Sequence, residues 1–358
     1  MVINKDYIIS RMIALIDEKQ KQSQPIGNKE WELYQKKQKF SPWLRKIIFS
    51  WWNPVYAMWK IRKKNKITTN CMSLLSADFT KYCLTENLNF DTEQFYPIGD
   101  EIVITTYIDN RLKDVLGSYE ELFNEENKKL QNLIKKQKDY FKVEYKGKKY
   151  NLPENYFQFS VFENQYGLSL LPYEAKKYIE GKDFLDIGAY IGDSILLLLQ
   201  YNPSKIFAYE PVSMIFEKLN KTLKINDISP EKAIPIKKGI GDNVATQTIY
   251  VEEGASSLIL QHRATTEEKI ELSTIDIESK DKNVGLIKMD VEGFEYYAIG
   301  GLETIKRDKP VLLISLYHTG KDFFEIPPIL KAAVPEYKFR FLDNMPFQLS
   351  EKILMAYV

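Results

Sequence analysis

Short apolar runs that end in glycine or acidic residues recur through the second half of the chain. Residues 184–187 form the first run, which leads into Gly188 and Gly192 and then into an apolar helical stretch. Residues 206–209 and 284–289 repeat the pattern. Runs of this kind are typical of parallel strands that are buried on both faces of a sheet. The pattern therefore predicts an α/β domain.

The rest of this half supplies further elements. Residues 141–152 alternate in polarity around Lys146-Gly147-Lys148, which predicts a hairpin. Ser213 is expected to cap a helix that runs to about Lys224. The pattern also predicts strands at 233–237, 246–251, 311–318, 337–342 and 352–358, and helices at 294–306 and 327–334.

The first 140 residues follow helical rather than strand periodicity. Apolar positions recur at helical spacing over residues 7–18, and a second long helical pattern covers residues 102–141. We therefore expect two parts, a mainly helical N-terminal region at 1–140 and the α/β domain at 141–358.

Residues 31–66 are basic and rich in tryptophan. They hold all five tryptophans, and no acid occurs between Glu32 and Asp78. Basic residues on both sides of an apolar centre are typical of an anchor that lies on anionic headgroups. A packed helical subdomain with solvated lysines explains the pattern equally well, and so does an electropositive cradle for an acidic glycan or a nucleotide-linked substrate.

Charge and cysteine content narrow the classes of protein. Lys and Arg total 50 against 49 acids, which argues against a nucleic-acid-binding surface over the whole chain. Cys71 and Cys83 form neither a metal motif nor a disulfide framework. The sequence has no signal-peptide core and no long apolar run. We expect a cytoplasmic protein, with contact to the inner face of the membrane through residues 31–66 as one of the alternatives above.

Carboxylates border the glycine turn. Asp186 precedes it and Asp193 follows it, and the middle glycine of a dinucleotide motif is missing. Acids are the wrong charge for a phosphate cradle and suit a cationic ligand such as S-adenosylmethionine (SAM). The alternative is a glycine turn in some other α/β domain. Glu210 lies 22 residues after Gly188, close to the roughly 20-residue offset at which an acid binds ribose hydroxyls.

A second charged motif follows the run at 284–289. Lys288, Asp290 and Glu292 lie at the carboxyl end of a predicted buried strand, where α/β sheets place their chemistry. Charges at such depth are costly unless they are paired or used. A purely structural pairing of Lys288 with Asp290 or Glu292 is the alternative.

Taken together, these motifs resemble the FkbM family of SAM-dependent methyltransferases. The resemblance covers about 141–358, and its most distinctive part is the Lys288-Met289-Asp290-Val291-Glu292-Gly293 segment; the other matching segments are 186–189, 209–211, 239–242 and 256–258. The family implies a class I methyltransferase (Rossmann-like) seven-stranded sheet, SAM as cofactor, and O-methylation, often of sugars or secondary-metabolite hydroxyls.

The resemblance also implies roles for individual residues. Gly188 and Asp186 would face the methionine moiety of SAM, Glu210 the ribose, and Asp242 with Ile240 the adenine. Asp290 and Glu292 would lie near the reacting centre. The full predicted cofactor set is Asp186, Gly188, Ala189, Tyr190, Gly192, Asp193, Ser194, Glu210, Pro211, Ile240, Gly241, Asp242 and Asp290.

Methyl transfer to a hydroxyl gains from a group that removes the proton, and a neutral histidine suits that task. His318 ends the predicted strand at 311–318 and is the first candidate, with Asp290 or Glu292 next and Lys288 completing the catalytic set; a structural histidine is the alternative. Ser315 stands where the family strand often has a glutamate, which leaves the base in question. No metal site is predicted, because the acids near Asp290 lack a partner motif elsewhere.

These observations predict an enzyme that methylates a hydroxyl, on a sugar of a surface glycan or on its nucleotide- or lipid-linked precursor. An inactive SAM-fold scaffold docked at a membrane is the runner-up, and a dinucleotide oxidoreductase is a distant third. We expect no nucleic-acid partner, and the oligomeric state is not predicted.

Overall fold

The computed structural model describes residues 124–252, 255–257, 266–318, 320–343 and 352–358. The predicted helix at 7–18, the tryptophan-rich segment at 31–66, most of the predicted helix at 102–141 and His262 lie outside the described residues. Within them, residues 124–133 are helical, but residues 134–140 are not and the strand β2 starts at 141. The predicted helix therefore ends well before residue 141.

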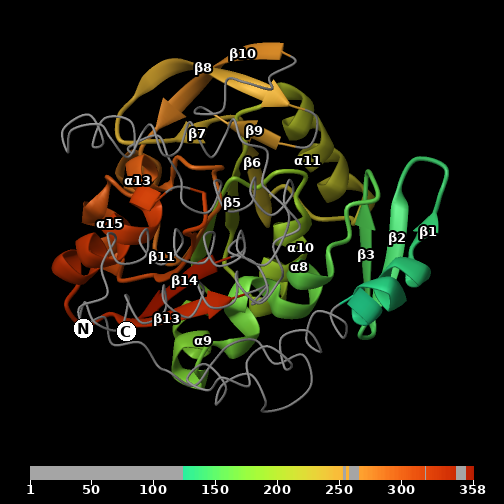
Figure 1. The fold of residues 1–358 in the computed structure, drawn as a ribbon, viewed down its shortest axis with the longest axis horizontal. Coiled ribbons are helices and arrows are strands. Elements are labelled where there is room, and N and C mark those ends of the chain that lie inside the picture. Colours follow the sequence, from blue (N-terminus) through green and yellow to red (C-terminus); the bar gives the residue numbers. More distant parts are fainter. Residues whose placement is uncertain (1–123, 253–254, 258–265, 319, 344–351) are drawn as a thin grey trace, which may run out of the picture.

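A seven-stranded sheet forms the centre of the described domain (Figure 1). Its strand order is β13-β14-β12-β11-β4-β5-β6, and β14 runs antiparallel to both of its neighbours. The strands are β4 (Asp183–Ile187), β5 (Ile206–Tyr209), β6 (Ala233–Ile236), β11 (Val284–Met289), β12 (Val311–Ser315), β13 (Lys338–Asp343) and β14 (Lys352–Tyr357). The predicted seven-stranded sheet, with its antiparallel closing strand, is confirmed.

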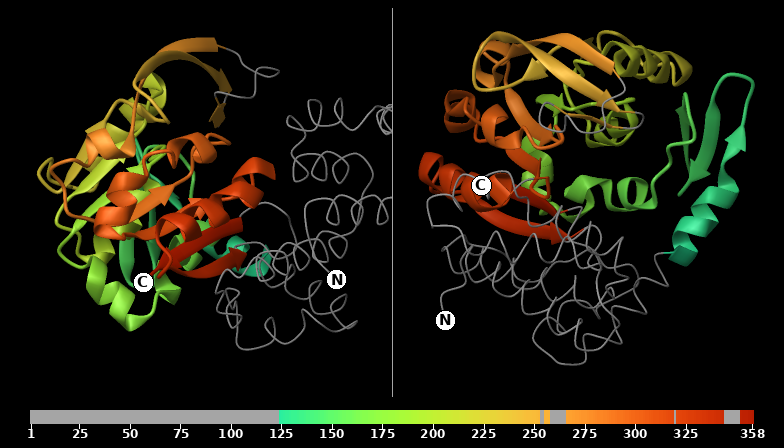
Figure 2. Two further views of the ribbon diagram at one scale, coloured as in Figure 1. Left: turned by 90° about the vertical axis from the view of Figure 1, so that its left-hand side faces the viewer. Right: turned by 45° about the horizontal axis from the view of Figure 1, so that its top comes forward.

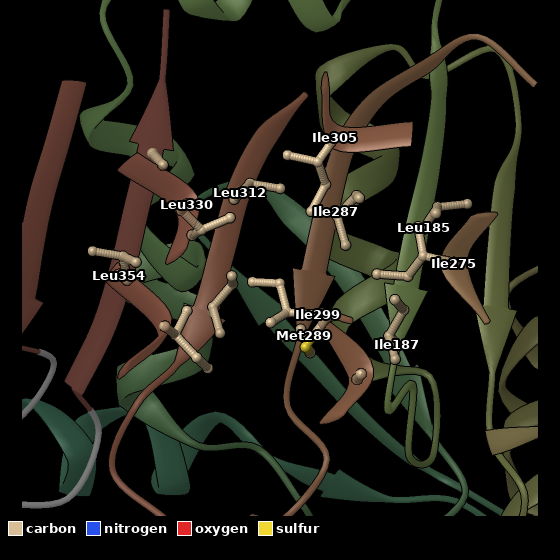
Figure 3. Close-up of a cluster of buried hydrophobic side chains, with 14 of the residues drawn as sticks. Leu185, Ile187, Ile275, Ile287, Met289, Ile299, Ile305, Leu312, Leu330 and Leu354 are labelled. Carbon is tan, nitrogen blue, oxygen red and sulfur yellow. The ribbon is translucent and has the colours of Figure 1, made fainter. Parts of the chain in front are cut away.

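Side chains of the central strands alternate between two cores, as the two-residue period of a strand requires. Leu185, Ile287 and Leu312 pack on one face of the sheet (Figure 3), whereas Phe184 and Leu286 pack on the other. All six residues of β11 and all five of β12 are buried. Burial on both faces explains why these strands are continuous apolar runs in the sequence.

Helices cover both faces of the sheet. The core on one face includes residues of α9 (Tyr173–Ile179), α10 (Asp193–Leu198) and α11 (Ser213–Ile225). The core on the other includes residues of α12 (Ile275–Glu278), α13 (Glu295–Ala298), α14 (Leu302–Asp308) and α15 (Gly320–Ala333). Short helices α8 (Phe159–Asn164), η2 (Gln165–Leu170) and η3 (Leu199–Tyr201) complete the set with described bounds.

Three helix predictions need correction. The single helix expected over 294–306 is two helices, since Gly300 and Gly301 separate α13 from α14 and glycine favours helix ends. Helix α15 begins at Gly320 rather than at 327. Ser213 does not cap α11: the Glu268 carboxylate accepts its backbone N–H at 3.0 Å and takes the capping role from a neighbouring strand.

A hairpin precedes the sheet, as predicted. Strands β2 (Phe141–Tyr145) and β3 (Lys148–Leu152) pair antiparallel around Lys146 and Gly147, and β1 (Lys135–Lys136) extends them to a three-stranded sheet.

A third sheet lies at one end of the described domain (Figures 1 and 2). Its order is β7-β10-β8-β9, with β7 (Gly239–Ile240), β8 (Ala245–Glu252), β9 (Ala255–Ser257) and β10 (Thr266–Ser273). The predicted inserted strand at 246–251 corresponds to β8. Strand β10 was not predicted; it has three consecutive charged residues, 267–269, before Ile270 and Leu272.

Candidate active site

A cavity of about 330 Å³ opens at the carboxyl ends of β4, β5, β11 and β12. Open parallel sheets bind their ligands at this edge, because helices and loops diverge there. The cavity is lined by Tyr156, Gln158, Val161, Tyr166, Ile187, Gly188, Tyr190, Asp193, Tyr209, Glu210, Pro211, Lys238, Gly239, Ile240, Ile249, Ile270, Leu272, Lys288, Asp290, Val291, Glu292, Phe294, Tyr317 and His318.

The glycine turn after β4 is packed directly against the exit of β11. Gly188 has φ +77°, and a Cβ added there would lie 1.8 Å from the backbone oxygen of Asp290. The backbone N–H groups of Gly188 and Ala189 donate to the carbonyl of Tyr209 at 3.0 Å each. Only glycine fits at this position, because a side chain would collide with the backbone of Asp290 and because the backbone is left-handed. Close approach of a ligand is a further, secondary reason.

A buried ion pair supports this turn from below. Lys288 Nζ lies 3.3 Å from Asp186 Oδ1 and donates to the Gly188 carbonyl at 2.7 Å, while the Ser194 hydroxyl donates to Asp186 Oδ2. Burial lowers the pKa of Lys288, but the carboxylates of Asp186 and Asp290 outweigh it and raise that pKa above its ordinary value. Lys288 therefore stays charged and holds the turn, which argues against a role as proton acceptor.

Glu210, directly after β5, is a buried acid that lines the cavity. It is 5% exposed, and its Oε1 accepts the backbone N–H of Val212 at 2.9 Å. Burial raises its pKa to about 8. An acid whose folded-state pKa is raised destabilises the fold as pH increases, because the folded protein binds the proton more tightly than the unfolded chain.

We expect Glu210→Gln to become more stable than the wild type as pH rises. The advantage should be absent near pH 4, grow between about pH 4.5 and 8, and reach about 1 kcal/mol or more, since each pKa unit corresponds to about 1.4 kcal/mol. Thermal unfolding of both proteins without ligand at several pH values measures it. A difference in melting temperature that does not change with pH would contradict the raised pKa.

Part of the predicted cofactor set reaches the cavity. Gly188, Tyr190, Asp193, Glu210, Pro211, Ile240 and Asp290 line it. Among the described residues, the other six do not line it: Asp186, Ala189, Gly192, Ser194, Gly241 and Asp242.

Packing explains why four of these six residues do not line the cavity. Asp186 and Ser194 bond to each other beneath the turn, and Ala189 lies in the apolar core. A Cβ on Gly192 would lie 2.8 Å from Leu219 Cδ1, so this glycine allows close approach of α11 rather than of the sheet. Asp242, expected at the adenine, is exposed.

The predicted catalytic acids Asp290 and Glu292 lie next to His318 in the cavity lining. His318 Nε2 lies 3.6 Å from Asp290 Oδ1 and 3.5 Å from Glu292 Oε2. The His318 side chain is 10% exposed, and that of Glu292 44%. The histidine comes from the loop after β12 and the two acids from the loop after β11. The structure therefore supplies the partner that the sequence analysis did not find for these acids.

Glu295 fixes the orientation of the histidine. Its buried carboxylate accepts the backbone N–H groups of Val291 at 2.8 Å and Gly293 at 2.9 Å. Its Oε1 also lies 2.9 Å from His318 Nδ1. Since a carboxylate only accepts, Nδ1 carries the proton of this bond. Glu295 follows the Lys288–Gly293 motif by two residues, but the sequence alone assigned it no role.

The acids around His318 set its charge. Burial lowers the pKa of the imidazole, but Glu295 first, and Glu292 and Asp290 after it, raise that pKa well above its ordinary value. Burial also raises the pKa of Asp290 and of Glu292. These carboxylates favour the protonated imidazole, which argues against His318 as a neutral base.

Aromatic and apolar side chains complete the walls. The aromatic residues of 156–166 divide between the cavity and the core: Tyr156 and Tyr166 line the cavity, whereas Phe157 and Phe162 are buried. Strands β8 and β10 add Ile249, Ile270 and Leu272, which the sequence analysis did not place at the site.

No helix among the described residues combines the length and the apolar character that crossing a bilayer requires.

One protein family matches part of this chain. Residues 186–341 match the methyltransferase FkbM domain. No curated protein matches the chain.

Three solved structures are similar to part of this chain. Methyltransferase FkbM from Methylobacillus flagellatus KT is 23% identical, with 49% of this chain and 44% of that chain covered and a TM-score of 0.41. The Pyrococcus abyssi tRNA (uracil-54, C5)-methyltransferase, solved with S-adenosyl-L-homocysteine, is 13% identical, with coverages of 62% and 45% and a TM-score of 0.35. Aeropyrum pernix fibrillarin, solved with S-adenosyl-L-methionine, is 12% identical, with coverages of 63% and 97% and a TM-score of 0.33. The chain thus spans less than half the length of the first two.

Proposed function

Because residues 186–341 are a methyltransferase FkbM domain, we propose that this protein is a SAM-dependent O-methyltransferase acting on a sugar hydroxyl. The acceptor is a surface glycan or its nucleotide- or lipid-linked precursor. The α/β domain at 141–358 carries the reaction, and the basic segment at 31–66 serves one of the roles named above.

One observation carries the proposal: a single cavity joins two different sets of groups. Gly188 and Glu210 line it, and so do Asp290, Glu292 and His318. The first set suits an adenosine-containing cation, because it offers close backbone approach and a carboxyl group for ribose hydroxyls. The second set suits an acceptor hydroxyl that must lose a proton.

The residues present fit SAM in charge and shape. Glu210 would hold the ribose, apolar Ile240 and Pro211 would contact the adenine, and Gly188 with Tyr190 would border the methionine moiety. When bound, SAM supplies an electrophilic methyl group on a sulfonium. Most of the rate gain then comes from holding the acceptor oxygen in line with that methyl group.

The acid–histidine cluster receives the proton of the acceptor. A carboxylate of Asp290 or Glu292 would take up the hydroxyl proton as the acceptor oxygen receives the methyl group that SAM would supply. His318, held by Glu295, places its charge beside these carboxylates and orients them. His318 is therefore proposed as part of the catalytic cluster and not as a neutral base acting alone.

Titration calorimetry with SAM, S-adenosylhomocysteine and NAD tests the cofactor. We expect binding of SAM and S-adenosylhomocysteine and none of NAD. Glu210→Ala should weaken SAM binding by more than about 1 kcal/mol, roughly tenfold or more, through lost hydrogen bonds to the ribose. Glu217→Ala, which removes an exposed acid on α11, is the matched control and should leave affinity unchanged. Equal affinities in all three proteins would refute the ribose role.

An acceptor screen tests the reaction. Nucleotide sugars, lipid-linked sugars and glycans are incubated with SAM, and S-adenosylhomocysteine release is measured. A product with a methyl ether on a sugar supports the proposal. SAM binding without turnover on any hydroxyl acceptor would count against it.

A further inference from the structure

Three ligand-type atoms converge at one point of the cavity wall. They are Asp290 Oδ1, Glu292 Oε2 and His318 Nε2, all within 4.8 Å of one another. His318 Nε2 is 3.6 Å and 3.5 Å from the two carboxylate oxygens. Atoms at these separations can share one ion at about 2.0 to 2.4 Å from each, the range of metal–nitrogen and metal–oxygen bonds.

Two of these atoms are buried without a hydrogen bond. Asp290 Oδ1 and His318 Nε2 are closed off from solvent and have no hydrogen-bond partner among the described residues. Buried polar atoms are normally satisfied, so a pair of them facing each other points to a missing cation. This observation is independent of the count of acids in the cluster.

The hydrogen bond at the other ring nitrogen of His318 also supports a cation at Nε2. Glu295 accepts the Nδ1 proton at 2.9 Å, so a bound cation would replace the proton on Nε2, the ring nitrogen that faces Asp290 and Glu292. Glu295 is itself fixed by the backbone N–H groups of Val291 and Gly293. A carboxylate that holds one nitrogen of a histidine while the other binds a metal is a common arrangement in metal sites.

We propose that Asp290, Glu292 and His318 bind one divalent cation of the Mg²⁺ or Mn²⁺ kind. Two carboxylates and one imidazole give mainly oxygen ligands, which suit these ions. Three protein ligands leave coordination positions free toward the cavity. There the ion holds the acceptor oxygen and favours loss of its proton. This catalytic role rests on the proposed function, whereas binding of the ion does not.

Binding of Mn²⁺ alone tests the site directly. The full chain is treated with chelator, freed of it, and titrated with Mn²⁺ without SAM or acceptor, while electron paramagnetic resonance reports free Mn²⁺. We expect one saturable Mn²⁺ per chain, displaced by excess Mg²⁺. Asp290→Asn and His318→Gln should each weaken binding tenfold or more. Glu295→Gln should weaken it about tenfold, as loss of an outer-shell partner does.

Glu303→Gln is the matched control, because Glu303 is exposed and pairs with Lys306 on α14. This variant should bind Mn²⁺ like the wild type. Circular dichroism and thermal melting establish that each variant is folded, and the two ligand variants give independent tests if one fails to fold. No saturable Mn²⁺ binding in the wild type would overturn the inference, as would equal binding in folded Asp290→Asn and His318→Gln; the cluster would then hold only a proton.

Failure of this inference differs from failure of the proposed function. Methyl transfer that continues in chelator, together with absence of Mn²⁺ binding, overturns the metal site and leaves the methyltransferase standing. Mn²⁺ binding that depends on Asp290 and His318, with no transfer to any hydroxyl acceptor, supports the metal site and overturns the O-methylation.

Discussion

His318→Ala should bind SAM as tightly as the wild type and turn over roughly 100-fold more slowly or worse, the size of a lost acid–base contribution. The imidazole lies 3.5 to 3.6 Å from Glu292 and Asp290 and lines the same cavity as Glu210, the proposed ribose site. Its removal leaves two carboxylates without the group that orders them. Calorimetry with SAM and the rate of S-adenosylhomocysteine formation with the best acceptor separate the two effects.

Glu295→Gln sharpens this experiment. The amide keeps the shape of Glu295 but lacks the charge that holds the Nδ1 proton, so turnover should fall by less than in His318→Ala. Glu303→Gln serves again as the control and should retain full turnover. If His318→Ala kept the wild-type rate, the proton would have to pass to the carboxylates without help from the histidine.

Gly188→Ala should destabilise the protein by about 3 kcal/mol or more, a large effect for a single methyl group. The added Cβ would lie 1.8 Å from the backbone oxygen of Asp290, and backbone of a central strand yields little. The left-handed φ of +77° adds strain for any residue with a Cβ.

Gly147→Ala separates strain from collision. Gly147 has a similar φ of +73°, but a Cβ there meets nothing within 4 Å, so only about 1 kcal/mol is expected. Chemical or thermal unfolding of both variants measures the difference. Similar losses in the two variants would mean that the Gly188 turn moves away from β11 at little cost.

The sequence by itself determined the sheet and the position of its ligand edge. Strands such as β5 and β11 are buried on both faces, so apart from Lys288 they carry no charged residue, and their ends are visible where glycines and acids begin. The spacing from Gly188 to Glu210 identified two residues that both line the cavity. Strand β10 was not predicted, because its charged residues resemble a polar loop. Only the pairing with β8 shows that they form a strand.

Only the tertiary structure showed that Asp290, Glu292 and His318 form one cluster. Asp186 was expected to meet a ligand, but the neighbouring strand places Lys288 3.3 Å from it and closes the pair beneath the turn. The strand order β12-β11-β4 brings together the loops that carry His318 and Asp290 and the helix α13 that carries Glu295. Local sequence patterns report which residues are buried, whereas contacts between strand ends depend on the order of the strands. The glycine turn was therefore predictable from the sequence, and the acid–histidine cluster required the fold.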